Sequence, residues 1–228
     1  MPERLSVAFD QRNTTALAYH ANDDRRAGAT LVLAHGAGAG QTSRFIVELA
    51  EGLAGRGVDV LTFNFLYTEQ GRKVPDRTEL LEACYRATVA EARSYPPFDG
   101  NRLFIGGKSM GGRIASHLAA AGDATAVTIA GLVLLGYPLH PPGKPEHLRV
   151  EHLSRIRVPV LVVQGEHDPF GSPEELRPHF ETLSAAATVH VVTGGDHSLA
   201  QKTQRKRGAL AGDSYGVIQD AIVTWLAR

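Results

Sequence analysis

Cysteine is almost absent from this 228-residue chain, in which Cys84 is the single cysteine. No disulfide can therefore form within the chain, and such sparse cysteine usage is typical of proteins in a reducing compartment. Neither sign of charge is in excess, since 24 lysines and arginines match 24 aspartates and glutamates. Without a net field, a general affinity for nucleic acid or for an anionic membrane is not expected.

Long apolar runs are also missing. No segment reaches the roughly 18 continuous apolar residues that a membrane-spanning helix requires. The N-terminus, from Met1 to Leu5, has neither the apolar stretch nor the small-residue cleavage site of a signal peptide. No set of histidines and carboxylates has zinc-ligand spacing. We therefore expect a soluble cytoplasmic protein that uses no metal or cofactor and has no nucleic-acid or membrane partner.

The length of the chain suits one substantial core and is too short for two domains of ordinary size. The sequence contains no internal repeat, low-complexity tract or linker, so residues 1–228 are expected to form a single domain. It carries no signal for an oligomeric state.

Strand and helix signals alternate along the chain. A β-hairpin is expected from residues 5–9 and 15–20. The continuous apolar run at 30–34 predicts a parallel strand covered on both faces, and further strands are expected at 58–65, 102–106, 130–136, 158–164 and 188–192. Helices are expected at 42–55, 77–95, 110–121, from 172 onward and at 214–228, with a helical piece near 147–155 and loops at 66–76 and 201–207. This order predicts an α/β fold with one doubly wound, mostly parallel sheet.

The most informative stretch is residues 103–116, where a predicted strand leads through a tight turn into a predicted helix. Within it, Gly107-Lys108-Ser109-Met110-Gly111 fits the pattern G-x-S-x-G. Glycines suit such a turn because a Cβ atom would collide with the adjacent strand and helix. The sharp bend would lift the Ser109 hydroxyl clear of the sheet, with the N-terminus of the helix directed at it. The pattern also occurs by chance in ordinary turns, so its context must support it.

Other chemically rich segments also follow the predicted ends of strands. They are residues 35–40, 67–73, 108–110, 137–140, 166–168 and 196–198. In open α/β sheets, ligands bind at the edge formed by the carboxyl ends of the strands. The order Ser109, Asp168, His197 is the order of nucleophile, acid and base found in α/β-hydrolases. We therefore predict that these three residues meet at one edge of the sheet.

Each of the three residue types has a chemical reason. A serine hydroxyl is a poor nucleophile at neutral pH, so His197 would accept its proton and later return it to the leaving group. Asp168 would fix the tautomer of the imidazole and stabilise its protonated form. Glu166 is an alternative acid, two residues earlier in the chain.

A tetrahedral oxyanion also needs hydrogen-bond donors that are already in place. The backbone N–H of Met110 is one candidate, and an N–H near Gly36 and Ala37 is the natural second, since glycines let the backbone approach a substrate closely.

Five further side chains near the predicted edge are candidates for binding substrate: Lys108, Tyr67, Arg72, Tyr137 and His140. Lys108 precedes the nucleophile in a crowded turn, where a long cation needs a partner. It would either reach solvent or a structural carboxylate, or contact an anionic group of the substrate with help from Arg72, Lys73, Arg113 or Lys144.

Five blocks of sequence, taken in order, resemble the α/β-hydrolase superfamily: residues 35–40, 106–113, 135–146, 164–171 and 195–198. More narrowly, the chain looks like bacterial predicted hydrolases related to NSL complex subunit 3 and to testis-expressed hydrolase-like domains. It is also similar to dienelactone-hydrolase-like proteins, which often have cysteine where this chain has Ser109. The resemblance implies a compact α/β-hydrolase fold with a catalytic triad and an oxyanion hole, but no particular substrate. Some relatives are protein-interaction parts, so a non-catalytic binding or scaffold protein remains the alternative.

The segment between the predicted fourth and fifth parallel strands, about 139–151, is short. Such a small cap indicates an open cleft and a small to medium soluble substrate. The prediction is a serine hydrolase that cleaves an ester, thioester or related acyl bond.

Two other classes of function, phosphate binding and dinucleotide binding, fit the sequence poorly. Gly107-Lys108-Ser109 copies the end of a phosphate-binding loop, but Arg102 stands where that motif needs its first glycine. Residues 36–38 begin a dinucleotide-binding pattern, but Gln41 replaces its last glycine and Asn64 follows the next strand instead of a carboxylate.

Overall fold

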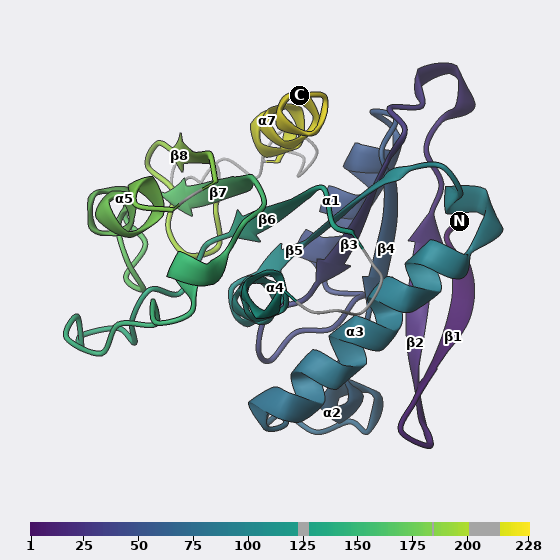
Figure 1. The fold of residues 1–228 in the computed structure, drawn as a ribbon, viewed down its shortest axis with the longest axis horizontal. Coiled ribbons are helices and arrows are strands. Elements are labelled where there is room, and N and C mark those ends of the chain that lie inside the picture. The colour runs from purple at the N-terminus through teal and green to yellow at the C-terminus, as the bar shows by residue number, and fades with distance from the viewer. Residues whose placement is uncertain (123–127, 184, 201–214) are drawn as a thin grey trace.

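An eight-stranded sheet forms the centre of the molecule in the computed structural model, which describes residues 1–122, 128–183, 185–200 and 215–228 (Figure 1). The strands lie in the order β1-β2-β4-β3-β5-β6-β7-β8. Their bounds are β1 Glu3–Phe9, β2 Arg12–Tyr19, β3 Ala29–Ala34, β4 Asp59–Phe63, β5 Arg102–Lys108, β6 Gly131–Leu135, β7 Val160–Gly165 and β8 Ala187–Val192.

The sheet is mostly parallel, as predicted. Strands β1 and β2 form the expected hairpin, and β2 pairs antiparallel with β4, while all other neighbours are parallel. The chain passes from β3 to β4 on one side and returns to place β5 on the other side of β3. The loops after β3 and β5 therefore leave the sheet on opposite sides of a crevice, which is where open α/β sheets bind ligands.

Helices cover both faces of the sheet, so the doubly wound prediction is confirmed. Helices α1 (Arg44–Ala54) and α7 (Gly216–Leu226) pack in one apolar cluster. Helices α3 (Thr78–Ser94), α4 (Met110–Ala121) and α5 (Pro173–Glu181) contribute to the second cluster. Figure 1 shows α3 crossing in front of the sheet, with α4 seen nearly end-on beside it. Strands β3, β4 and β6 are buried along their whole length, because each has a helical layer on both sides.

Two segments differ from the expectation, and hydrogen bonds explain both differences. The predicted loop at 66–76 begins with one helical turn, α2 (Leu66–Glu69), in which the Asp76 carboxylate accepts the N–H of Tyr67. The helical piece expected near 147–155 is only the 3-10 turn η3 (Leu153–Arg155). Before it, Leu139 and Tyr137 bind the backbone N–H and carbonyl of Arg149, which a helix would have used internally.

The remaining short elements are the 3-10 turns η1 (Asp23–Arg25) and η2 (Pro96–Phe98). Helix α5 begins with a capping box between Ser172 and Glu175, with proline at its first position as expected. The predicted basic loop at 201–207 lies outside the described residues, and the final helix is described from Gly216.

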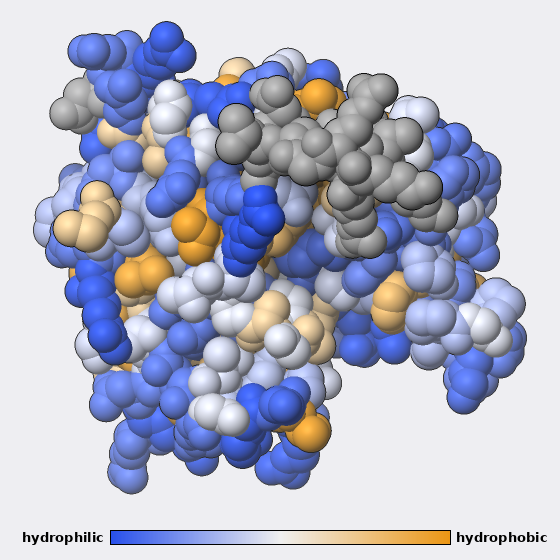
Figure 2. All heavy atoms as spheres, turned by 180° about the vertical axis from the view of Figure 1, so that it is seen from behind, coloured by the Kyte–Doolittle hydropathy of each residue, from blue (hydrophilic) through white to orange (hydrophobic). Residues whose placement is uncertain are grey.

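The surface and the single thiol fit this architecture. Cys84 is buried in α3, and burial raises the pKa of its thiol to about 12, which disfavours the reactive thiolate. Outside the residues drawn in grey, Figure 2 shows a mostly polar face with apolar residues scattered over it. Among the described helices, none has the length and apolar character needed to cross a membrane.

Candidate active site

The turn between β5 and α4 holds Ser109 in a backbone conformation that side chains rarely adopt, with φ 51° and ψ −117°. The surrounding glycines allow it. A Cβ atom at Gly107 would lie 2.7 Å from the carbonyl oxygen of Ala34, and one at Gly111 would lie 2.5 Å from that of His35. These are backbone contacts that cannot move aside cheaply, so both positions require glycine. A strained serine at a strand-to-helix turn is the geometry of a nucleophile elbow.

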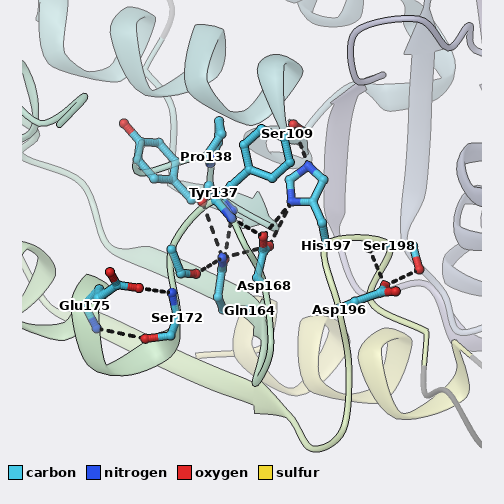
Figure 3. Close-up of polar contacts among 12 residues, drawn as sticks. Ser109, Tyr137, Pro138, Gln164, Asp168, Ser172, Glu175, Asp196, His197 and Ser198 are labelled. Carbon is cyan, nitrogen blue, oxygen red and sulfur yellow. Dashed lines mark hydrogen bonds and ion pairs between the residues drawn. The ribbon is translucent and has the colours of Figure 1, made fainter. Parts of the chain in front are cut away.

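Three side chains from different strand ends form one hydrogen-bonded chain (Figure 3). The Nε2 atom of His197 lies 2.9 Å from Oγ of Ser109. The Nδ1 atom of His197 lies 2.8 Å and 3.0 Å from the two carboxylate oxygens of Asp168. Asp168 follows β7 and His197 follows β8, so the parallel sheet brings both to the edge at which β5 ends. The predicted convergence of these residues is present in the structure.

The Asp168 carboxylate is fully buried and held from several sides, whereas the His197 side chain is 24% exposed. Gln164 donates to Asp168 Oδ2 over 2.9 Å, and the N–H of Phe170 donates to Oδ1 over 2.9 Å. Gln164 in turn accepts the N–H of Tyr137 and donates to the carbonyl of Gly171. These contacts fix the position of the carboxylate.

The imidazole of His197 is held by packing as well as by hydrogen bonds. The ring of Phe170 lies against it, with 4.2 Å between the ring centroids and 33° between the planes. The ring plane and the orientation toward Ser109 are thereby fixed before any substrate binds.

Neighbouring polar residues have other partners. Glu166, the alternative acid, accepts the N–H of Gly194 over 2.6 Å. Asp196 accepts the backbone N–H and the hydroxyl of Ser198. His35 is buried and accepts the N–H of Phe65 at Nε2. Within the described ranges, no group of three or more histidine, cysteine, aspartate or glutamate side chains is arranged to hold a metal ion.

A cavity of about 790 Å³ opens in front of Ser109 and His197. Gly36, Ala37 and Met110, the residues predicted to supply oxyanion donors, lie in its wall. Gly36 lies close to Ser109, since a Cβ atom built at position 36 would lie 3.6 Å from the Cβ of Ser109. The rest of the wall is mainly apolar, and its charged residues include Arg113, Arg149 and Asp196.

Lys108 also lines this cavity, yet its charge does not face it. The residue as a whole is half-buried, whereas its Nζ atom is buried and has no hydrogen-bond partner among the described residues. Nζ lies beside Gly136, where a Cβ atom would approach it to 2.8 Å. Burial lowers the pKa of Lys108 to about 8, an effect that Asp168 and Asp196 partly oppose.

The other four predicted substrate contacts do not line the cavity. Tyr67 is buried in the core, and Arg72 forms an ion pair with Asp76. Tyr137 is also buried, and its hydroxyl donates to the carbonyl of Arg149 over 2.7 Å. His140 lies 3.4 Å from Glu175. A position near the end of a strand places a residue at the correct edge, but these side chains turn toward the core, toward α5 or, for Arg72, toward Asp76 in the same loop.

Three residues of the site were not predicted from the sequence. They are Gln164, which binds Asp168, Phe170, which packs on His197, and Arg149, which lines the cavity. Gln164 had a signal, because it is the one polar residue at the end of the apolar run 158–164, four residues before Asp168. Arg149 had none, because the segment that carries it has no regular pattern.

Comparison with known proteins assigns this chain to a family. A family model described as an alpha/beta hydrolase domain matches residues 27–226. The chain belongs to the alpha/beta hydrolases. Solved structures similar to this hydrolase include a dienelactone hydrolase from Anabaena variabilis, with a TM-score of 0.76 and 18% identity, covering 99% of this chain and 96% of that one.

Two further structures share the fold of this alpha/beta hydrolase. XC6422 from Xanthomonas campestris, described as an α/β serine hydrolase without a lid, has a TM-score of 0.70 and 21% identity, with 96% and 94% of the two chains covered. Est1E from Butyrivibrio proteoclasticus has a TM-score of 0.72 and 15% identity, with 98% and 97% covered.

Proposed function

We propose that this alpha/beta hydrolase is a serine hydrolase that cleaves an ester, thioester or related acyl bond of a small to medium soluble substrate. The observation that carries the proposal is the 2.9 Å contact between Ser109 Oγ and His197 Nε2, at a strained turn that presents the hydroxyl to an open cavity. The hydrogen bond that the Asp168 carboxylate accepts from Nδ1, the opposite nitrogen of the imidazole, supports the same role.

In the proposed reaction, Oγ of Ser109 attacks the carbonyl carbon of the substrate while its proton passes to Nε2 of His197. Collapse of the tetrahedral intermediate breaks the bond to the leaving group, which takes the proton from His197, and leaves an acyl group on Ser109. A water molecule then attacks the acyl carbon, giving its proton to His197. The acid product leaves, and the proton returns to Ser109. This chemistry requires no metal or cofactor.

The oxyanion formed in each half-reaction would accept hydrogen bonds from the backbone. Met110 is the first residue of α4, where backbone N–H groups have no partner within the helix. Gly36 and Ala37 approach from the loop after β3, on the other side of the crevice. Each such donor is worth roughly 3–4 kcal/mol in the transition state.

The short cap supports the proposed substrate size. Residues 142–148 are exposed and none of them lines the cavity, in contrast to what a large closed lid would show. The Xanthomonas campestris structure with the same fold is also described as having no lid. A small acyl compound could enter such a cleft without a closing step.

Labelling with a fluorophosphonate, together with a series of p-nitrophenyl esters of graded chain length, tests the proposal. Wild-type protein should be labelled and should turn over the short esters, and Ser109→Ala should lose both properties while remaining folded. Ser43→Ala is the matched control, because Ser43 lines the same cavity and its side chain makes no capping hydrogen bond. If folded wild-type protein shows neither labelling nor turnover, the alternative of a non-catalytic binding or scaffold protein replaces this one.

A further inference from the structure

Two arginines face the cavity that contains Ser109. Arg113 lies in the first turn of α4, four residues after Ser109, and Arg149 lies in the cap segment before η3. Both line the cavity together with Ser109 and His197, although 36 positions of sequence separate them. The mainly apolar wall thus carries two arginines near the proposed nucleophile, and Asp196, which accepts hydrogen bonds from Ser198, is the one acidic residue among the described residues of the wall.

Neither charge is neutralised by the described part of the chain. No described acidic side chain lies within ion-pair distance of either arginine. Nε of Arg113 is buried and has no hydrogen-bond partner among these residues. The Arg149 side chain makes one hydrogen bond, from Nη1 to the carbonyl of Pro138 over 3.2 Å. A guanidinium group has five donors, so most of those on both arginines have no acceptor in the described part of the chain.

The two arginines also act on each other. Burial lowers the pKa of Arg149, and the positive charge of Arg113 lowers it further. Arg113 additionally borders a second cavity of about 320 Å³ that contains Glu82 and Glu151. These carboxylates lie beyond ion-pair distance, so they reduce the repulsion only weakly. Holding two half-buried like charges together is unfavourable unless an anion joins them.

The position of Arg149 is set before binding. Its backbone N–H donates to the carbonyl of Leu139 over 2.8 Å, and its carbonyl accepts the hydroxyl of the buried Tyr137 over 2.7 Å. Arg113 is held by the helix that starts at the nucleophile. A site with a fixed backbone loses little conformational entropy when it binds a ligand.

We propose that Arg113 and Arg149 form an anion subsite that binds a carboxylate or phosphate group of the substrate while Ser109 attacks its acyl carbon. The subsite rests on the proposed function of Ser109 and narrows it to anionic acyl compounds. Planar guanidinium groups match the geometry of both oxyanions and can bind them with two parallel hydrogen bonds. Lys108 is not part of the subsite, because its Nζ atom is buried away from the cavity surface.

The test compares esters that differ only in charge. For the acyl side, p-nitrophenyl hydrogen adipate is compared with p-nitrophenyl hexanoate; for the leaving-group side, 4-(butyryloxy)benzoate is compared with phenyl butyrate. In at least one pair, the anionic ester should have a kcat/KM at least tenfold higher, expressed mainly as a lower KM. Raising the salt concentration to 0.5 M should reduce this preference, because exposed charge interactions are screened.

Arg113→Gln and Arg149→Gln should each reduce the ratio of anionic to neutral kcat/KM by roughly ten- to a hundredfold, the effect of losing charge-assisted hydrogen bonds. Arg177→Gln is the matched control, because it removes the same charge from an exposed position on α5. Equal rates within both pairs of esters for the wild type would overturn the subsite, and so would Gln variants that keep the wild-type ratio.

Failure of the subsite can be told apart from failure of the proposed function. Neutral esters that are hydrolysed by the wild type but not by Ser109→Ala keep the proposed function, whatever the ratio. Calorimetric binding of hydrogen adipate and hexanoate esters to Ser109→Ala measures the subsite without turnover. Tighter binding of the anionic ester than of the neutral one by Ser109→Ala, with the difference lost when Arg113→Gln or Arg149→Gln is added, supports the subsite. Equal binding of the two esters by Ser109→Ala refutes it.

Discussion

Replacing Lys108 by methionine should stabilise the protein at neutral pH, by an amount that falls as the pH rises. The ammonium group of Lys108 is buried beside Gly136 without a hydrogen-bond partner among the described residues. Burial moves its pKa from 10.5 to about 8 in the folded protein. This shift corresponds to about 3 kcal/mol of folding free energy lost while the lysine is fully charged.

The sign follows from the number of protons bound. Because the pKa in the folded state is the lower one, the unfolded chain binds more protons between about pH 8 and pH 10.5. Stability contributed by this group therefore rises with pH across that window. At pH 7 nearly the whole cost is present, and by pH 9.5 about 2 kcal/mol of it has been removed. A methionine has no such dependence, and its packing contribution is the same at both pH values.

Urea unfolding of the wild type and Lys108→Met at pH 7.0 and 9.5 measures this effect. The difference in free energy of unfolding between the two proteins should be about 2 kcal/mol smaller at the higher pH. Lys144→Met is the matched control for removing a lysine, because residue 144 is exposed. A difference that stays constant between the two pH values would refute the view that Lys108 carries a buried, poorly compensated charge.

Two further substitutions test the support of the site. Tyr85→Phe should lower the free energy of unfolding by about 1–3 kcal/mol in urea, because the buried hydroxyl accepts the N–H of Gly106 over 2.8 Å and would leave it without a partner; a change below about 0.5 kcal/mol would contradict this. Gln164→Leu should lower kcat for a neutral ester roughly ten- to a hundredfold with little change in KM, because Asp168 and the N–H of Tyr137 each lose a hydrogen bond. An unchanged kcat in the Leu variant would show that Phe170 and the backbone alone hold the carboxylate.

Much of the fold could be predicted because a parallel strand that is buried on both faces consists mainly of consecutive apolar residues. The run at 30–34, for example, became β3 (Ala29–Ala34) with an error of one residue. One of the failures has a clear physical cause. At 147–155 the backbone groups of Arg149 bind Tyr137 and Leu139, and a pattern read along one segment cannot anticipate partners from another.

The same distinction applies to the site. Ser109, Asp168 and His197 could be brought together from sequence, because each follows a parallel strand and the topology alone places them at one edge. The direction in which a side chain points could not be predicted in this way. Lys108 sits in the expected place, but its stem turns its ammonium group into the interior beside Gly136, and only the packed structure determines that choice.

The crowding around the nucleophile has a consequence for redesign by directed evolution. Positions 107 and 111 tolerate no side chain. The space that a side chain would need is occupied by backbone atoms of Ala34, at the end of β3, and of His35, which follows it. Residues 142–148 of the cap, in contrast, face solvent and are free to vary. Random libraries aimed at these cap residues should therefore yield mostly folded variants, whereas libraries spread over the turn around Ser109 should yield mostly misfolded ones.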